Sequence, residues 1–191
     1  MKKLSKEIIS FVVTILISVA IVFGIRHFIA EPVTVDGRSM DYTLQDGERM
    51  FMLKLNKIDR FDVVVLPAPT DAKKLYIKRV IGLPGDTIAY QNDQLIINGQ
   101  TVDEPYLAKK QAEITGNFTE DFTLEQVAGE AVVPEGKAFV MGDNRQNSLD
   151  GRAFGFVDLE TLTEADFIHW PLNQIGFTEK YQLTENGIEK R

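Results

Sequence analysis

The chain of 191 residues contains no cysteine and only two histidines. The absence of cysteine excludes disulfides, thiolate metal sites and cysteine nucleophiles. His27 stands in an apolar N-terminal segment, so a histidine general base would have to be His169. Two isolated histidines also exclude a histidine-rich metal site. We expect the protein to use no metal and no cofactor.

Serine is scarce as well, with five in the chain. Ser5, Ser10 and Ser18 fall in the N-terminal segment, which leaves only Ser39 and Ser148 beyond it. A hydroxyl nucleophile in the remainder of the chain must therefore be one of these two serines or a threonine.

Beyond residue 30, basic side chains are fewer than acidic ones. Residues 1–30 carry four basic side chains and one acidic one, so the remainder of the chain holds 17 basic and 27 acidic groups. An acidic surface repels phosphates, and we expect no nucleic-acid partner. Hydrophobic residues make up 44% of the chain. This composition is typical of one globular domain with a short appendage.

The appendage is an apolar run near the N-terminus. The residues from Ile8 to Ile25 are uncharged, and in a helix they span about 27 Å, close to the hydrocarbon thickness of a bilayer. We expect a membrane-spanning signal-anchor helix over residues 8–28. The lysines of residues 1–7 place that short N-terminus in the cytoplasm and residues 29–191 outside the membrane, by the positive-inside rule.

A cleaved signal peptide is the competing interpretation of this run. Ser18-Val19-Ala20 matches a small-x-small cleavage site. The site lies inside the apolar run, however, and the apolar regions of secretory signals usually have only about 7 to 15 residues. The length of the run therefore favours an uncleaved anchor.

Beyond Pro32 the sequence becomes a series of short β-rich runs separated by turn signals. Asn98-Gly99 is the left-handed pair of a tight hairpin, and Asn92-Asp93 stands where the preceding hairpin must turn. We expect a mainly β, antiparallel domain over residues 29–191. The expected strands are Val33–Val35, Met50–Leu55, Phe61–Leu66, Leu75–Ile81, Thr87–Tyr90, Leu95–Ile97, Thr101–Val102 and Lys137–Met141.

Residues of about 86–136 are expected to form a small inserted hairpin and cap. The polar, acidic stretch from Glu104 to Glu130 within them is expected to hold a short helix. The tail from Ala165 to Phe177 returns to core-like residues and is expected to close the sheet. Residues 50–53 fit a buried strand better than an exposed apolar edge in contact with lipid.

Ser39 is the first residue suited to catalysis. It follows an extended run and a bend at Gly37, and a glycine two residues before a serine lets the chain approach a substrate closely. By itself this pattern is more typical of an ordinary serine in a glycine turn.

Lys78 strengthens the catalytic interpretation of Ser39. It emerges from an otherwise apolar strand, and burial among apolar side chains lowers the pKa of a lysine so that it can act as a general base. With cysteine absent and histidine scarce, a Ser/Lys pair is the simplest combination of nucleophile and base available. The alternative is a surface lysine with Arg79 solvated beside it.

The stretch from Met141 to Phe156 crowds polar and charged groups between two apolar runs. An Asp/Arg pair and buried hydrogen bonds would hold such a loop in shape beside a catalytic centre. A plain solvated turn is the alternative. The polar and charged residues concerned are Asp143, Asn144, Arg145, Ser148, Asp150 and Arg152.

Together these segments resemble the bacterial type I signal peptidases, the membrane-bound serine endopeptidases that remove signal peptides from secreted proteins. The motifs GRSMDYTL, DRFDVVV, YIKRVIGLPGD and GDNRQNSLDGRAFGF occur in the family's order, and the resemblance covers the anchor and nearly all of the remaining chain. It implies a β fold of signal-peptidase type at the bacterial plasma membrane. The implied partners are the signal peptides of secreted pre-proteins, the lipid bilayer and the secretion translocon.

The resemblance also implies residue roles. Ser39 matches the nucleophile, Lys78 the general base and Ser148 the serine that orients the lysine amine. Cleavage after Ala-x-Ala sites is implied, with the backbone N–H of Ser39 meeting the oxyanion. Structural positions near the site are matched by Gly37, Asp143, Asn144, Arg145, Asp150 and Arg152, of which Asp150 and Arg152 form the implied ion pair. Positions that line two shallow apolar pockets are matched by Val33, Val35, Met40, Leu44, Tyr76 and Ile77.

Three positions depart from the family's pattern. Gly37 stands where some members have a serine or threonine that donates to the oxyanion, so this chain would use backbone donors alone. Tyr42 replaces a proline and Gly151 replaces a serine. Neither belongs to the Ser39/Lys78 pair, but both are expected to change the loops around it.

Other functions remain as alternatives at this stage. A self-cleaving regulator of the SOS-repressor type shares the Ser/Lys pair, but the membrane segment and the absence of a helix-turn-helix argue against it. A membrane-tethered, non-catalytic β domain would bind extended peptides and cut nothing. A Ser/His/Asp hydrolase would need His169, which stands in a core-like strand.

Overall fold

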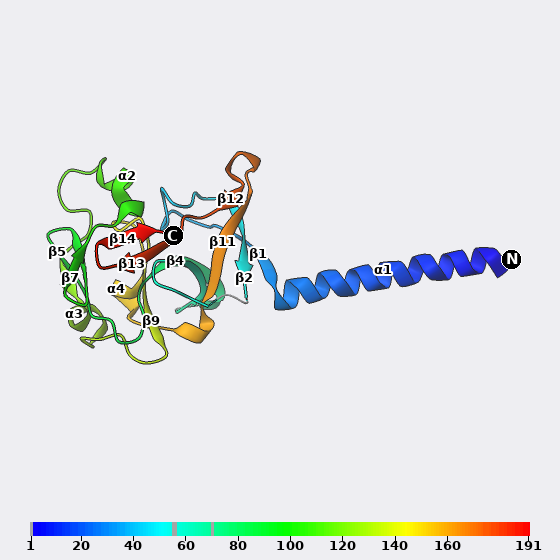
Figure 1. Ribbon diagram of the computed structural model, residues 1–191, viewed down its shortest axis with the longest axis horizontal. Coiled ribbons are helices and arrows are strands. Elements are labelled where there is room, and N and C mark those ends of the chain that lie inside the picture. Colours follow the sequence, from blue (N-terminus) through cyan, green and yellow to red (C-terminus); the bar gives the residue numbers. More distant parts are fainter. Residues whose placement is uncertain (1, 55–56, 70) are drawn as a thin grey trace.

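The computed structural model describes residues 2–54, 57–69 and 71–191. Met1 and Leu55, which was expected to end the strand from Met50, lie outside the described residues, as do the side chains of residues 2–5. Within the described ranges, one long helix is followed by antiparallel strands and short helices (Figure 1).

The long helix α1 (Lys2–Phe28) is the one expected from the apolar run. Its stretch Lys6–Phe28 contains an 18-residue window with a mean hydropathy of 2.9, is long enough to cross a membrane, and is not buried against the domain within that window. Figure 1 shows α1 projecting straight away from the strands. A helix that is apolar all round needs an apolar surrounding, which a bilayer supplies and water does not.

The strands form a main sheet in the order β1–β2–β11–β3–β4–β9–β10, with β12 paired to β11. Every neighbouring pair is antiparallel, which confirms the expected fold class. The strands are β1 (Ala30–Thr34), β2 (Arg49–Leu53), β3 (Val63–Ala68), β4 (Asp71–Gly82), β9 (Lys137–Met141), β10 (Val157–Asp158), β11 (Thr163–Trp170) and β12 (Gly176–Phe177).

The insertion between β4 and β9 contains a second antiparallel sheet, in the order β7–β6–β5–β8. Its hairpins turn at Asn92-Asp93 and Asn98-Gly99, and all four residues have positive φ, as the sequence predicts. The short helix expected in the acidic stretch is present as three short pieces. The elements are β5 (Ile88–Gln91), β6 (Gln94–Ile97), β7 (Gln100–Val102), η1 (Pro105–Leu107), α2 (Ala108–Gln111), β8 (Phe122–Thr123) and α3 (Leu124–Ala128).

Buried clusters hold these parts together. One cluster packs Tyr90 and Leu95 of the cap against Phe61 and Phe139 of the main domain. Another places Met50 and Met52 of β2 under the segment that follows β1. Because both methionines are buried, residues 50–53 form the expected core strand and not a lipid-facing edge.

The tail from Ala165 enters the sheet, where β11 pairs with β2 on one side and with β3 on the other, as expected for a segment that closes the sheet. One expectation about the strands is corrected. Phe61 does not begin β3, because its φ is 69° and its N–H donates to the carbonyl of Val80 at 2.7 Å. This left-handed turn delays the strand until Val63.

A C-terminal hairpin is present that the sequence analysis missed. It consists of β13 (Tyr181–Thr184) and β14 (Gly187–Lys190). Asn186-Gly187 is a tight-turn signal that marks it in the sequence. The remaining short elements are α4 (Gly151–Phe154), η2 (Leu159–Thr161) and η3 (Leu172–Gln174).

Candidate active site

Ser39 lies in the segment between β1 and β2. Gly37 makes the bend with a φ of 94°, and its N–H donates to Asp46 Oδ1 at 2.8 Å. The N–H groups of Thr43 and Leu44 both donate to the carbonyl of Met40, at 3.0 and 2.9 Å, so a helical turn follows the serine. Met40 and Leu44 are fully buried, which anchors this turn on the core.

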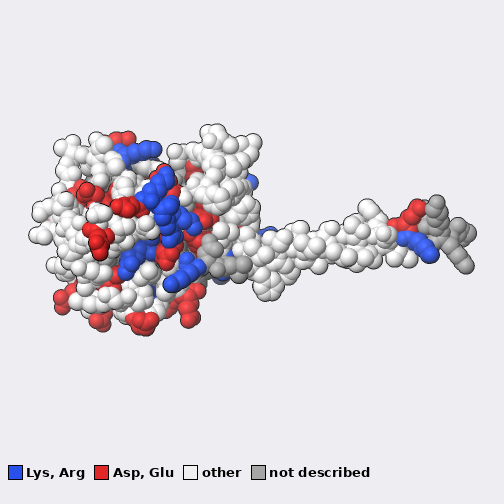
Figure 2. All heavy atoms as spheres, in the orientation of Figure 1, with Lys and Arg blue, Asp and Glu red and all other residues white. Residues whose placement is uncertain are grey.

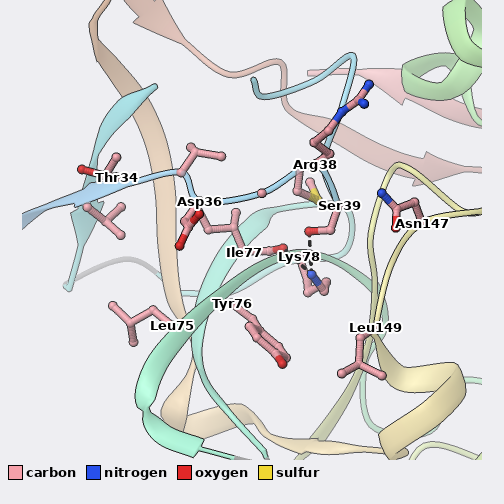
Figure 3. Close-up of a pocket in the computed structure, with 14 residues that line it drawn as sticks. Thr34, Asp36, Arg38, Ser39, Leu75, Tyr76, Ile77, Lys78, Asn147 and Leu149 are labelled. Carbon is pink, nitrogen blue, oxygen red and sulfur yellow. Dashed lines mark hydrogen bonds between the residues drawn. The ribbon is translucent and has the colours of Figure 1, made fainter. Parts of the chain in front are cut away.

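Lys78 comes from β4, and its side chain meets Ser39 in the cleft (Figure 3). Its Nζ donates to Ser39 Oγ at 2.8 Å and to the carbonyl oxygen of Ile77 at 3.0 Å. The residue is only 3% exposed. Burial lowers the pKa of Lys78 from its ordinary 10.5 to about 8, against the opposing influence of Asp150 and Asp143. The surface-lysine alternative is therefore wrong for this strand.

Ser148 also lies beside the pair, but it does not make the expected hydrogen bond. The side-chain amine of Lys78 is bound to Ser39 and to the Ile77 carbonyl. The hydroxyl of Ser148 is buried, and a hydrogen bond from this residue is among the causes that lower the pKa of Asp150. A role for Ser148 in orienting the lysine stays a prediction.

Gly142 lies between Ser148 and Ser39, and its lack of a side chain lets the two residues come close. The sequence analysis did not identify this glycine. A Cβ at this position would lie 2.2 Å from Ser148 Oγ and 2.5 Å from the carbonyl oxygen of Ser39. Only glycine fits there. The signal available in the sequence was its place directly before Asp143.

Asp143 forms a buried ion pair with Arg79, the neighbour of Lys78 on β4. Arg79 Nε and Nη2 donate to the two carboxylate oxygens at 2.9 and 2.6 Å, and both side chains are 1% exposed. Thr43 donates to the same carboxylate at 2.5 Å. Asp143 thus ties the turn after Ser39 to the strand that carries Lys78. The sequence analysis had considered Arg79 as a solvated side chain, and this is wrong.

Asn144 binds the backbone carbonyls of Ser39 and of the residue before it. Its N–H donates to the Ser39 carbonyl at 3.0 Å, and its Nδ2 donates to the Arg38 carbonyl at 2.9 Å. These bonds connect the 142–152 loop directly to the turn that presents the serine.

Asp150 and Arg152 form the expected ion pair, at 2.9 Å. Asp150 also accepts from the N–H of Gly142 at 3.0 Å, and Arg152 Nη2 donates to the Arg145 carbonyl at 2.8 Å. Burial by itself raises the pKa of Asp150, but the hydrogen bonds and charge of Arg152 lower it overall. The carboxylate therefore stays charged and keeps the loop closed on itself.

Arg145 pairs with Glu104 of the cap, a partner that sequence reasoning missed. Arg145 Nη2 and Glu104 Oε1 are 2.5 Å apart, and both side chains are almost completely buried. Tyr90 and Tyr106 donate to the same carboxylate at 2.7 and 2.6 Å. Arg145 Nε donates to the Gly142 carbonyl at 3.0 Å, so this network connects the cap to the 142–152 loop. No local pattern in the sequence marks Glu104.

Tyr42 and Gly151, the two loop positions that depart from the family's pattern, both make close contacts. The Tyr42 hydroxyl donates to the Glu113 carboxylate, and Lys110 lies 4.6 Å from the centre of the Tyr42 ring, so this residue joins the turn after Ser39 to the cap. A Cβ at Gly151 would lie 2.8 Å from the Phe139 ring and from the Val140 carbonyl. Glycine thus fits the close packing at that position.

A cleft of about 220 Å³ opens beside Ser39 and Lys78, between the end of β1 and β4. Leu44 is a correction to the expected pockets, because its side chain is fully buried beneath the cleft and does not line it. Asn147 and Leu149 line the cleft without having been expected, and Figure 3 shows both on the loop that faces Ser39. The expected residues that do line it are Val33, Val35, Met40, Tyr76 and Ile77, joined by Thr34, Asp36, Arg38 and Leu75.

The described residues do not form a Ser/His/Asp site or a cluster suited to bind a metal ion. His169 lies in β11 with its ring 4.6 Å from the ring of Phe51, and it does not line the cleft beside Ser39. This arrangement contradicts the Ser/His/Asp alternative. In residues 2–54, 57–69 and 71–191, no group of three or more histidine, aspartate and glutamate side chains is placed to hold a metal ion.

Comparison with known proteins agrees with the sequence motifs. Residues 8–170 match the family model described as signal peptidase, peptidase S26. The chain is 46% identical to signal peptidase I of Bacillus caldolyticus, over 84% of this chain and 91% of that protein. It is 37% identical to signal peptidase IB of Staphylococcus aureus (strain MRSA252), over 96% of this chain and 100% of that protein.

A solved structure is similar as well. The crystal structure of a signal peptidase I from Enterococcus faecalis V583 superposes with a TM-score of 0.55 at 42% identity, covering 58% of this chain and 97% of that one. The sequence match extends over most of the chain and includes the segments that carry Ser39, Lys78 and the 142–152 loop. The chain therefore belongs to the signal peptidase family, peptidase S26.

Proposed function

We propose that this membrane-anchored peptidase cleaves signal peptides from secreted pre-proteins with Ser39 as nucleophile and Lys78 as general base. The observation that carries the proposal is the buried amine of Lys78, 2.8 Å from the hydroxyl of Ser39 and with its pKa lowered to about 8. An amine in this state is uncharged often enough at neutral pH to accept a proton.

The reaction follows from this geometry. Uncharged Lys78 takes the proton of Ser39 as its oxygen attacks the scissile carbonyl, and the ammonium then protonates the departing amine of the mature protein. The signal peptide remains as an ester on Ser39. A water molecule that gives its proton to Lys78 hydrolyses the ester, and the proton returns to Ser39. The oxyanion in each half-reaction would meet the backbone N–H of Ser39.

The substrate would bind as an extended strand between β1 and β4. β1 is at the edge of the main sheet, where β2 is its one partner among the described strands, and the pairing of β4 with β9 begins at Arg79. Leu75–Ile77 therefore face the cleft with backbone groups that no β9 residue covers. A peptide that adds to these edges is held by backbone hydrogen bonds, while its alternate side chains enter the cleft.

The lining of the cleft supports specificity for small side chains. Val33, Val35 and Ile77 are apolar and line the cleft beside Ser39. In the proposed mode of binding, this lining accepts small apolar side chains at the positions before the cut, which suits cleavage after Ala-x-Ala sites.

The membrane supplies a second partner. The arrangement proposed is an N-terminus in the cytoplasm, α1 across the bacterial plasma membrane and the β domain outside, next to emerging pre-proteins and the secretion translocon. Large apolar side chains are exposed where β11 meets β12, at Trp170, Leu172, Ile175 and Phe177. Figure 1 shows these strands at the end of the domain from which α1 projects, and Figure 2 shows little charge there. This loop is suited to contact lipid headgroups.

The dyad is tested by removing each partner. Ser39→Ala and Lys78→Met should each reduce cleavage of a purified pre-protein by at least about 100-fold, because they remove the nucleophile or the base. Lys78→Arg should fail equally, since a guanidinium does not lose its proton near neutral pH. Lys74→Met on the same strand, at an exposed position, is the matched control and should retain full activity.

Two measurements decide the outcome. Cleavage is followed by the mass of the released mature protein, and a serine-acylating probe is followed by intact mass. Wild type should form an adduct on Ser39, whereas a non-catalytic peptide-binding domain would form none. Cleavage by Lys78→Met at the wild-type rate would exclude Lys78 as the base.

A further inference from the structure

The junction between the membrane helix and the catalytic sheet contains no flexible linker. α1 ends at Phe28 and β1 begins at Ala30, so Ile29 is the only residue between them. The Ile29 N–H donates to the Ile25 carbonyl at 2.8 Å, which continues the helical pattern to the joint. The Ile29 carbonyl accepts from the backbone N–H of Lys54 at 3.0 Å. The helix therefore runs directly into the edge strand of the sheet.

The side chain of Lys54, just beyond β2, contacts both sides of this joint. Its Nζ lies 3.3 Å from the His27 carbonyl and 3.4 Å from the Arg26 carbonyl, and it forms an ion pair with Glu31 Oε2 at 2.8 Å. The last carbonyls of a helix have no partner within the helix, and a cation stabilises the negative end of its dipole. Lys54 thus binds the end of α1 and the start of β1 at once.

This joint also determines where the cleft lies relative to the bilayer. β1 continues from the helix to Val33 and Thr34, which line the cleft, and Ser39 follows five residues after the strand ends. A signal peptide held in the same bilayer as α1 must reach this cleft from its own apolar segment. The angle between α1 and β1 therefore sets the length of chain that a substrate needs between that segment and the bond that is cut.

We propose that Lys54 is a positioning residue that fixes this angle and so selects which of several possible cleavage sites is used. The proposal rests on the proposed function, because it needs α1 and the substrate in one membrane. Lys54 touches neither Ser39 nor the cleft, so it acts on the choice of bond and leaves the chemical step unchanged.

The test uses the full-length protein in liposomes and a membrane-inserted pre-protein with three consecutive Ala-x-Ala sites at increasing distance from its apolar segment. The masses of the mature products give the ratio of cleavage at the three sites. Lys54→Met should shift this ratio by about threefold or more toward the neighbouring sites, because the last carbonyls of α1 lose the donor that links them to Glu31. Lys54→Arg keeps the charge and the donors and should restore the wild-type ratio.

Matched controls separate this effect from damage to the enzyme. Lys57→Met removes an exposed lysine three residues away and should leave the ratio unchanged. All variants should cleave a short water-soluble peptide with the wild-type kcat/KM. Glu31→Gln removes the ion pair while keeping Lys54, and it should shift the ratio in the same direction by a smaller factor.

The outcomes are distinguishable. If wild type cleaves neither substrate, the proposed function fails. If wild type cleaves both and the site ratio is the same in Lys54→Met and Glu31→Gln, the positioning role is overturned. If Lys54→Met does not fold, Glu31→Gln alone decides, and an unchanged ratio in that variant overturns the proposal.

Discussion

Lys78 can take a proton from Ser39 only while its amine is uncharged. Burial disfavours the ammonium form and lowers the pKa of Lys78 to about 8, although two carboxylates act in the opposite direction. Asp143 is already paired with Arg79 and Asp150 with Arg152, so neither supplies a full counter-charge to the lysine. These two pairs keep negative charge near the site without returning the lysine to its ordinary pKa.

The pH dependence of activity follows from this pKa. A base with a folded-state pKa of about 8 is mostly protonated below that pH and mostly neutral above it. We expect kcat/KM for a short peptide to rise about tenfold per pH unit well below pH 8 and to level off above about pH 9. Rates measured from about pH 6 to about pH 10 check this, with Lys74→Met as the control. A flat profile contradicts the assignment of Lys78.

The elements around the dyad are held by pairs that join distant segments. The 142–152 loop is bound to β4 through Asp143 and Arg79, and to the cap through Arg145 and Glu104. The cap is therefore part of the framework that positions Gly142 and Ser39. Its sheet packs on the main domain through a shared core, which makes this framework rigid.

Glu104 tests the contribution of the cap. Glu104→Gln leaves Arg145 charged and buried without its counter-ion, and we expect it to lower the free energy of unfolding by about 3 to 5 kcal/mol. Activity should fall as well, because Arg145 also holds the Gly142 carbonyl. Urea unfolding and peptide cleavage measure the two effects. Glu120→Gln, at an exposed position of the same cap, should change neither, and an unaltered unfolding midpoint for Glu104→Gln would contradict the role.

At the scale of the whole molecule, the proposed arrangement places the candidate active site, the helix joint and the exposed apolar loop next to the same membrane surface. Trp170 is the last residue of β11, directly before that loop, is 48% exposed, and is the only tryptophan in the sequence. Tryptophan is favoured at the interface between lipid and water. Its fluorescence therefore reports directly on whether the β11–β12 loop reaches the bilayer.

In liposomes, the emission of Trp170 in the full-length protein should be blue-shifted and quenched by brominated lipid. Replacing both Leu172 and Ile175 by serine should weaken the quenching, because it removes apolar area from the loop. Arg49→Lys, at the β2 position that pairs with Trp170, keeps the local charge and is the control. Emission typical of an aqueous tryptophan, with no quenching, would show that the loop stays in water.

The candidate site was only partly predictable from the sequence. Ser39, Lys78 and the loop that holds Asp150 and Arg152 drew attention as a serine after a glycine bend, a lysine in an apolar strand and charges crowded into one loop. Their expected roles, including the Asp150/Arg152 ion pair, came from the resemblance of these motifs to the signal peptidases. Gly142, Arg79 and Glu104 were missed because their roles depend on partners 41 to 64 residues away or on the space left by other side chains. Leu44 was assigned to a pocket because sequence position does not tell a lining residue from one beneath it.

The sequence by itself determined the membrane helix, the tight hairpins and the β-rich character of the domain, because runs of apolar residues and turn pairs act over a few neighbouring residues. Only the tertiary structure decided that β11 runs through the middle of the sheet, that Lys78 reaches Ser39, and that Lys54 binds the end of α1. These arrangements depend on strand order and burial. Both result from how the whole chain packs its core, which no local pattern specifies.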